Sequence, residues 1–114
     1  MHELGTVLYV IERVEELAEK NQLSQIGSVT LEVGEVSGIV PAYLTDCWQW
    51  AVKRSERMNS AELKIEILPA VTFCENCEKT YETVKYGRTC PNCGSDKTYL
   101  LTGNEYNIKE IEAC

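Results

Sequence analysis

Four of the six cysteines form two closely spaced pairs that could bind one metal ion together. They lie in the stretch CENCEKTYETVKYGRTCPNCG and are Cys74, Cys77, Cys90 and Cys93, with twelve residues between the pairs. A Cys-x-x-Cys spacing lets two thiolates face the same ion, and two such pairs complete a tetrahedral sulfur shell. Gly94 and Pro91 suit the tight turn of the second pair. The spacing therefore predicts a structural zinc site.

Other chemistry also uses cysteines at this spacing. The stretch CPNCG resembles the iron-binding loops of rubredoxin-type proteins, and a single pair can form a redox disulfide, which would leave the other pair unexplained. Many zinc ribbons bind nucleic acid, but here Glu75, Glu78 and Glu82 alternate with the nearby basic residues, so no basic stripe forms. A zinc-ribbon adaptor that recruits protein or RNA partners is the alternative function.

A second set of candidate ligands lies at the amino terminus, where the only histidine is residue 2. The α-amine of Met1, the backbone nitrogen of His2 and its imidazole can close adjacent chelate rings on one metal ion. The amide or the carboxylate of Glu3 could supply a fourth donor, because first-turn amides have no partner within a helix. Nitrogen donors in a square-planar array suit Ni²⁺ or Cu²⁺. A solvated terminal histidine without a role is the competing interpretation.

Length and composition limit the classes of protein to consider. A chain of 114 residues predicts one domain, or one domain that carries a small insert. The net charge of −7 disfavours nucleic acid and anionic membranes as partners. We expect a cytoplasmic protein, because the cysteines suit a metal site and neither a signal peptide nor a membrane span is evident. Without a nucleophile–base pair or a phosphate loop, an enzyme is not expected.

Two amphipathic helices are predicted to support these sites. The first covers residues 2–21, and its apolar stripe consists of Leu4, Val7, Leu8, Ile11, Val14, Leu17 and Ala18. The second covers residues 41–57 and begins at Pro41, a residue favoured in the first turn of a helix. Its apolar stripe consists of Leu44, Trp48, Ala51 and Val52.

Three strands complete the predicted fold, at residues 28–33, 62–68 and 103–113. The fold class is α+β: a small three-stranded mixed or antiparallel sheet with two helices on one face, plus an inserted four-cysteine zinc-ribbon domain. The other face of the sheet would be wet, and it carries Thr30, Glu32, Lys64 and Glu66. The α/β domain comprises residues 1–69 and 100–114, and the zinc-ribbon domain comprises residues 70–99.

Several of these features occur together and in a fixed order. They are the initial MHE, the amphipathic first helix, the turn GEVSG followed by Leu44, the cysteine stretch, and GNE at residues 103–105. Over essentially the whole chain, this order resembles the HypA/HybF family of nickel metallochaperones. The ribbon alone is a common feature, whereas its combination with a terminal Met-His-Glu is specific to the family.

The resemblance implies nickel binding near the amino terminus, with His2 as the ligand and Glu3 as its neighbour, and zinc binding by the four paired cysteines. It also implies partners: a HypB-type GTPase, the precursor of the [NiFe]-hydrogenase large subunit and, in some members, proteins of urease maturation. One position departs from the family pattern. Some members place a nickel-binding aspartate near the position of Val40, and valine cannot coordinate a metal.

Overall fold

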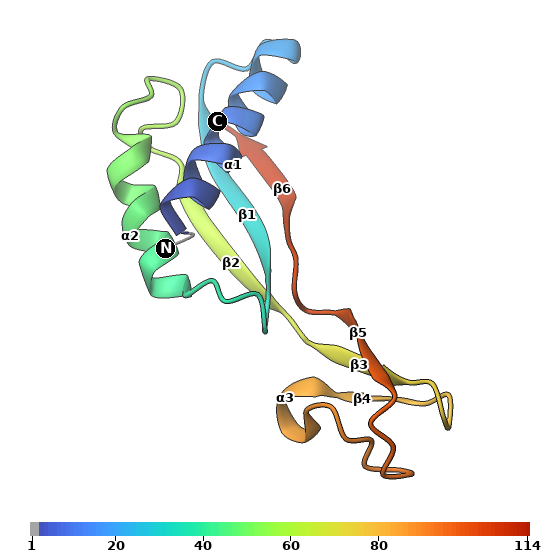
Figure 1. The fold of residues 1–114 in the computed structure, drawn as a ribbon. Coiled ribbons are helices and arrows are strands. Elements are labelled where there is room, and N and C mark those ends of the chain that lie inside the picture. The colour runs from blue at the N-terminus through green and yellow to red at the C-terminus, as the bar shows by residue number, and fades with distance from the viewer. Residues whose placement is uncertain (1–2) are drawn as a thin grey trace. The chain divides into compact units, whose positions relative to one another are not determined.

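The computed structural model describes residues 3–114 (Figure 1). The elements in chain order are α1 (Glu3–Lys20), β1 (Ile26–Gly34), α2 (Pro41–Val52), β2 (Glu62–Leu68), β3 (Val71–Cys74), β4 (Thr80–Glu82), α3 (Thr83–Tyr86), β5 (Thr98–Thr102) and β6 (Tyr106–Ala113). The described chain divides into two compact units. Among the described residues, the first comprises residues 3–32, 39–66 and 107–114, and the second comprises residues 33–38 and 67–106.

The first sheet has the strand order β2-β1-β6, so β1 lies in the centre. The N–H of Glu35, just after β1, donates to the carbonyl of Leu68 at the end of β2 (2.8 Å), so these strands are parallel. The N–H of Cys114 donates to the carbonyl of Gln25 (3.2 Å), which joins the end of β6 to the start of β1 in an antiparallel sense. Of the two predicted arrangements, mixed and antiparallel, the sheet has the mixed one, and α2 connects its two parallel strands (Figure 1).

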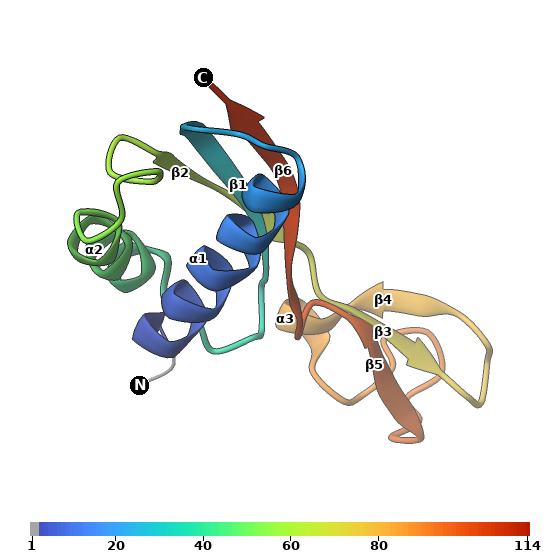
Figure 2. The ribbon, with the colours of Figure 1, turned by 90° about the horizontal axis from the view of Figure 1, so that it is seen from above.

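Both helices cover one face of this sheet, as predicted (Figure 2). The core between them is made of fully or almost fully buried side chains: Val7, Val10, Val14, Ala18, Ile26, Val29, Leu31, Leu44, Trp48 and Met58. Trp48 is 2 % exposed, and its indole N–H donates to the carbonyl of Ala61 at 3.0 Å. This hydrogen bond satisfies the one polar group of a large apolar side chain, which would otherwise be costly to bury.

The buried face of α1 is narrower than the sequence pattern predicts. Leu8 and Leu17 are 50 % and 39 % exposed, whereas Val10 is fully buried. The apolar residues of this helix cover a wide arc, and only the side chains that face the sheet or α2 lose contact with water.

The second helix is shorter than predicted and ends at Val52 instead of residue 57. The N–H groups of Arg54 and Ser55 donate to carbonyls three residues earlier, which tightens the chain into a turn. The hydroxyl of Ser55 then accepts from the N–H of Met58 and donates to Glu15. These side-chain hydrogen bonds compete with the continuation of the helix.

The outer face of the first sheet is drier at its centre than predicted, because Thr30 is only 4 % exposed. Lys64 of β2 reaches across the central strand to Glu112 of β6 (3.2 Å), and Lys109 pairs with Glu66 in the same way (2.7 Å). These two ion pairs span β1, whose Ser28 and Thr30 are 6 % and 4 % exposed.

The second unit is built on a small antiparallel sheet with the strand order β4-β3-β5. Phe73 of β3 lies opposite Thr80 of β4 and Tyr99 of β5. Backbones approach closely where this sheet begins: a Cβ atom at Gly34 would collide with the carbonyl of Gly103, and one at Gly103 would collide with Ala70. Over residues 3–114, none of the helices has the length and apolar character needed to cross a membrane.

Candidate metal sites

The four predicted cysteine ligands come together in the second unit, where their Sγ atoms all lie within 4.8 Å of one another. The Sγ atom of Cys74 lies 3.6 Å from that of Cys93, and the same distance separates Cys77 from Cys90. Sulfurs bound to zinc at ~2.3 Å stand about 3.8 Å apart at the corners of a tetrahedron. No disulfide joins these thiols. The cluster therefore fits one tetrahedral metal ion.

Each cysteine pair sits in a turn with the same hydrogen bonds. The N–H of Glu78 donates to the carbonyl of Cys74, and that of Gly94 donates to the carbonyl of Cys90, both at 2.8 Å. In both turns the N–H of the first cysteine also donates to the carbonyl five residues later, at 2.9 Å. Glu78 and Gly94 have positive φ angles of 60° and 77°, which confirms the conformational freedom expected from Gly94. The repeated turn explains why both pairs present their thiols alike.

Burial differs between the four thiols. Cys74 and Cys90 are buried together with Tyr81, Cys77 is partly buried against them, and Cys93 is exposed. This apolar cluster has only four members, and three of them are candidate metal ligands. A bound metal would therefore contribute much of the folding free energy of this unit.

Local contacts give the thiols different acidities. The amide group of Asn76 donates to the sulfur of Cys93 at 3.4 Å, and this contact and a backbone N–H lower the pKa of Cys93 to about 6. Burial raises the pKa of Cys77 to about 12. The cluster thus holds one thiol that ionises readily and one that a metal ion must deprotonate.

The candidate nickel ligands are described only in part. Met1 and His2 lie outside the described residues, whereas Glu3 is the first residue of α1 and is 5 % exposed. The Oε2 atom of Glu3 accepts a hydrogen bond from the N–H of Val40 at 3.0 Å. Val40 precedes α2, so this contact joins the start of α1 to the start of α2. The two positions that the sequence singled out separately are therefore neighbours.

The carboxylates of the GEVSG and GNE motifs bind the backbone. Glu35 accepts from the N–H of Ala70 at 2.9 Å. Glu105 accepts from the N–H of Gly103 at 2.7 Å and from the hydroxyl of Thr102 at 3.2 Å, and these contacts lower the pKa of its carboxyl group. Both glutamates thus stabilise the place where the backbones approach closely.

Two contacts at these sites were not predicted from the sequence. The bond from Glu3 to Val40 spans 37 positions, and no local pattern signals it. The contact of Asn76 with Cys93 had a signal, because an asparagine precedes the second cysteine in both CENC and CPNC.

Comparisons with known proteins agree over the whole chain. The family model described as "Hydrogenase/urease nickel incorporation, metallochaperone, hypA" matches residues 1–113. The hydrogenase maturation factor HypA of Albidiferax ferrireducens is 31 % identical over 112 residues and HypA 1 of Bradyrhizobium diazoefficiens is 33 % identical, each comparison covering 98 % of both chains. The solution structure of the nickel metallochaperone HypA from Helicobacter pylori is 25 % identical, with a TM-score of 0.75, and the match covers 99 % of this chain and 97 % of that one.

A small α+β fold with a closed cluster of four thiols defines a metal-binding protein. The match over residues 1–113 then identifies the family: the chain belongs to the HypA family of nickel-incorporation metallochaperones for hydrogenase maturation. The family name describes a maturation factor and not a catalyst, as the sequence predicted.

Proposed function

We propose that this chain carries nickel at its amino terminus, on Met1, His2 and Glu3, and holds zinc in the four-cysteine cluster. The observation that carries the proposal is the family match over residues 1–113, combined with a thiol cluster whose spacing suits tetrahedral zinc. A tetrahedral sulfur site would be filled by zinc, so nickel needs a second site with nitrogen donors. His2 is the only histidine in the chain.

The contact made by Glu3 supports a specific choice of donors. Its carboxylate is buried and already accepts a hydrogen bond from the N–H of Val40. We therefore assign the fourth donor to the backbone amide of Glu3 rather than to its carboxylate. The carboxylate joins the start of α1 to the residue that precedes α2.

The two sites would serve different purposes. Four thiolates enclose a metal from all sides, which suits a zinc ion that stays bound. A chain terminus leaves a metal open to a partner, which suits a cargo that must be released. In this proposal the nickel-binding domain comprises residues 1–69 and 100–114, and the zinc-ribbon domain comprises residues 70–99.

The recipient would be the precursor of the [NiFe]-hydrogenase large subunit, and a HypB-type GTPase would assist the transfer. Delivery toward urease maturation belongs to the same proposal, because the family description names both enzymes. We place the protein in the cytoplasm, where thiols stay reduced and free for metal.

A nickel titration of the zinc-loaded chain with an unmodified amino terminus tests the nickel site. We expect one nickel per chain, with affinity that falls as the pH falls, because the imidazole and the amides must lose protons to bind. His2→Ala should abolish nickel uptake and leave the zinc content unchanged, as measured by calorimetry and elemental analysis.

A second variant tests the terminal amine. Extending the chain by Gly-Ser before Met1 keeps His2 but moves the amine away, so nickel uptake should again be lost. If both variants bind nickel as the parent does, the terminal site is wrong, and the zinc-ribbon adaptor becomes the better function.

A further inference from the structure

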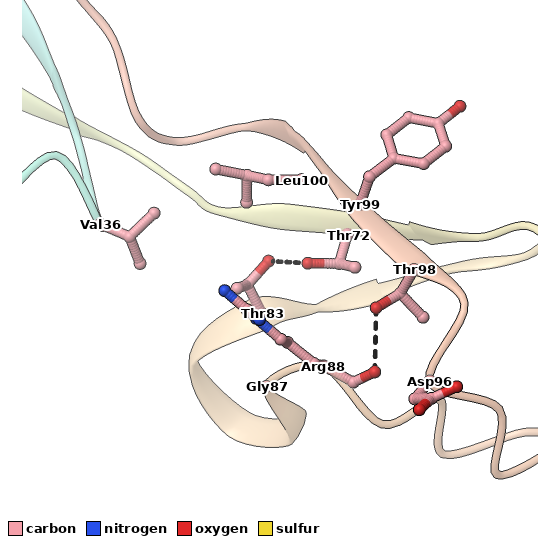
Figure 3. Close-up of a pocket in the computed structure, with 9 residues that line it drawn as sticks. All are labelled: Val36, Thr72, Thr83, Gly87, Arg88, Asp96, Thr98, Tyr99 and Leu100. Atoms are coloured by element: carbon pink, nitrogen blue, oxygen red, sulfur yellow. Dashed lines mark hydrogen bonds between the residues drawn. The ribbon is translucent and has the colours of Figure 1, made fainter.

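A cavity of about 400 Å³ lies within the second unit, outside both candidate metal sites. It lies between β5 and the loop that follows α3, and Figure 3 shows the side chains around it. Its lining includes the polar side chains of Thr72, Thr83, Arg88, Asp96 and Thr98. Its size falls within the range of known small-ligand pockets, roughly 300–1,000 Å³.

The cavity contains a cation without a counter-ion. Arg13 and Arg57 form ion pairs with glutamates, but in the described part of the chain no carboxylate lies within 4.0 Å of the Arg88 guanidinium. Figure 3 shows the side chain of Arg88 extending toward Thr83 and away from Asp96. Arg88 is exposed, so its guanidinium is accessible to a ligand. Its planar guanidinium suits an oxyanion, which it can bind through two parallel hydrogen bonds.

Two hydrogen bonds fix the backbone that carries this arginine. The hydroxyl of Thr98 on β5 donates to the carbonyl of Arg88 at 2.9 Å. The hydroxyl of the buried Tyr81 donates to the carbonyl of Gly87 at 2.9 Å. The loop is thus anchored at the peptide bonds before and after Arg88, which lowers the entropy cost of binding a ligand.

A pair of hydroxyls supplies a further donor. The side-chain oxygens of Thr72 and Thr83 lie 2.6 Å apart, and Thr72 is 4 % exposed. When one of these hydroxyls donates to the other, the second keeps its own proton available for a ligand. One oxyanion can accept hydrogen bonds from the hydroxyl and from the guanidinium at the same time.

The rest of the lining decides which oxyanion fits. Val36 and Leu100 are each 37 % exposed, so apolar surface remains available to a ligand. The ring of Tyr99 points away from Arg88 and packs against Phe73, with 5.4 Å between the ring centroids (Figure 3). The carboxylate of Asp96 on another wall would repel a dianionic phosphate more than a monoanion. We propose that this cavity binds a carboxylate attached to an apolar group, with Arg88 and the Thr72–Thr83 pair as its donors. The proposal goes beyond nickel and zinc binding and does not depend on either.

An NMR titration of the full metal-loaded chain tests the proposal with two carboxylate probes. The first is 3-phenylpropionate, a free acid, and the second is the acidic tripeptide acetyl-Leu-Glu-Leu-amide. We expect at least one to bind with a dissociation constant on the order of 1 mM and to shift the amide signals of residues 83–88 and 98–100. Tighter binding of the free acid indicates a small-molecule ligand, whereas tighter binding of the peptide indicates an acidic segment of a partner protein.

Matched controls test whether binding requires the charge of Arg88 and that of the carboxylate. Arg88→Gln should weaken binding at least about tenfold, whereas Lys85→Gln, which removes a neighbouring charge outside the cavity, should not change it. The neutral probes 3-phenylpropionamide and acetyl-Leu-Gln-Leu-amide should bind at least about tenfold more weakly than the acids. The proposal is overturned if acid and amide bind equally, if neither acid binds, if Arg88→Gln has no effect, or if inorganic phosphate binds more tightly than the carboxylates.

Discussion

At the scale of single residues, Glu3 is where the structure changes the interpretation of the sequence most. The residue was a candidate nickel ligand through its amide or its carboxylate. Its carboxylate is buried and binds the N–H of Val40, a residue whose side chain cannot coordinate metal. The backbone of Val40 therefore helps to hold the start of α1, even though its side chain cannot bind a metal.

Two substitutions separate a positioning role of Glu3 from direct coordination. Glu3→Gln keeps an oxygen that can accept from Val40, so nickel affinity should stay near that of the parent. Glu3→Ala removes the acceptor and should weaken nickel roughly 10–100-fold, as loss of a supporting contact does at other metal sites. Calorimetry on untagged protein measures both affinities. Equal losses in the two variants would show that the carboxylate itself is a ligand.

The sequence was informative wherever chemistry is local. The spacing of Cys74, Cys77, Cys90 and Cys93 predicted their cluster, because each pair closes its own short turn. Contacts between distant residues were not accessible in this way. The hydroxyl of Ser28 donates to Glu112 at 2.6 Å across 84 positions, and nothing in either local stretch indicates the pairing.

At the scale of elements, the tightest constraint is the close approach of three backbone segments around Gly34, Ala70 and Gly103. Gly103 has a φ of 109°, and a side chain there would collide with Ala70. Glu35 and Glu105 bind backbone N–H groups at the same place. At Gly103 a side chain larger than hydrogen is excluded for two independent reasons, the backbone conformation and the lack of space.

Gly103→Ala should destabilise the protein by about 2–5 kcal/mol, because backbone strain and collision add. Gly38→Ala is the matched control, since Gly38 also has a positive φ (83°) but has no atom within 4 Å of the added methyl group. That variant should lose only about 1–2 kcal/mol. Denaturant unfolding measures both values, and a similar loss in the two variants would argue against the collision.

Apolar periodicity predicted the types and order of the helices and strands in the first unit. It did not predict which residues of α1 are buried or where α2 ends. The pattern of α1 could not distinguish Leu8 and Leu17 from the buried residues of the helix, since all are apolar. The early end of α2 depends on contacts of Ser55 with Met58 and Glu15. Competition between tertiary contacts and helix propensity decides such boundaries.

At the scale of the whole molecule, the two units differ in what stabilises them. The first has a continuous core of aliphatic side chains around Trp48, whereas the cluster in the second consists of Tyr81 and thiols. The stability of the second unit should therefore depend on metal, and that of the first should not.

Removal of the metal by a strong chelator should unfold residues 67–106 and leave the helices of the first unit intact. The lost stabilisation would be large, since apparent zinc binding in small domains is worth roughly 10–16 kcal/mol. NMR signal dispersion before and after chelation reports each unit separately. Cys93→Ser should behave like the chelated protein, whereas Cys114→Ser, outside the cluster, should retain metal. Global unfolding on chelation would contradict this independence.

The burial of Trp48 also has an optical consequence. The only two tryptophans are Trp48, which is 2 % exposed, and Trp50, which is 50 % exposed beneath the Arg54 guanidinium at 4.0 Å. Both belong to the first unit, whereas the second unit has tyrosines and no tryptophan. Indole emission therefore reports one unit alone, with a buried and a hydrated fluorophore two residues apart. The chain contains its own label-free probe of the unit that bears the proposed nickel site.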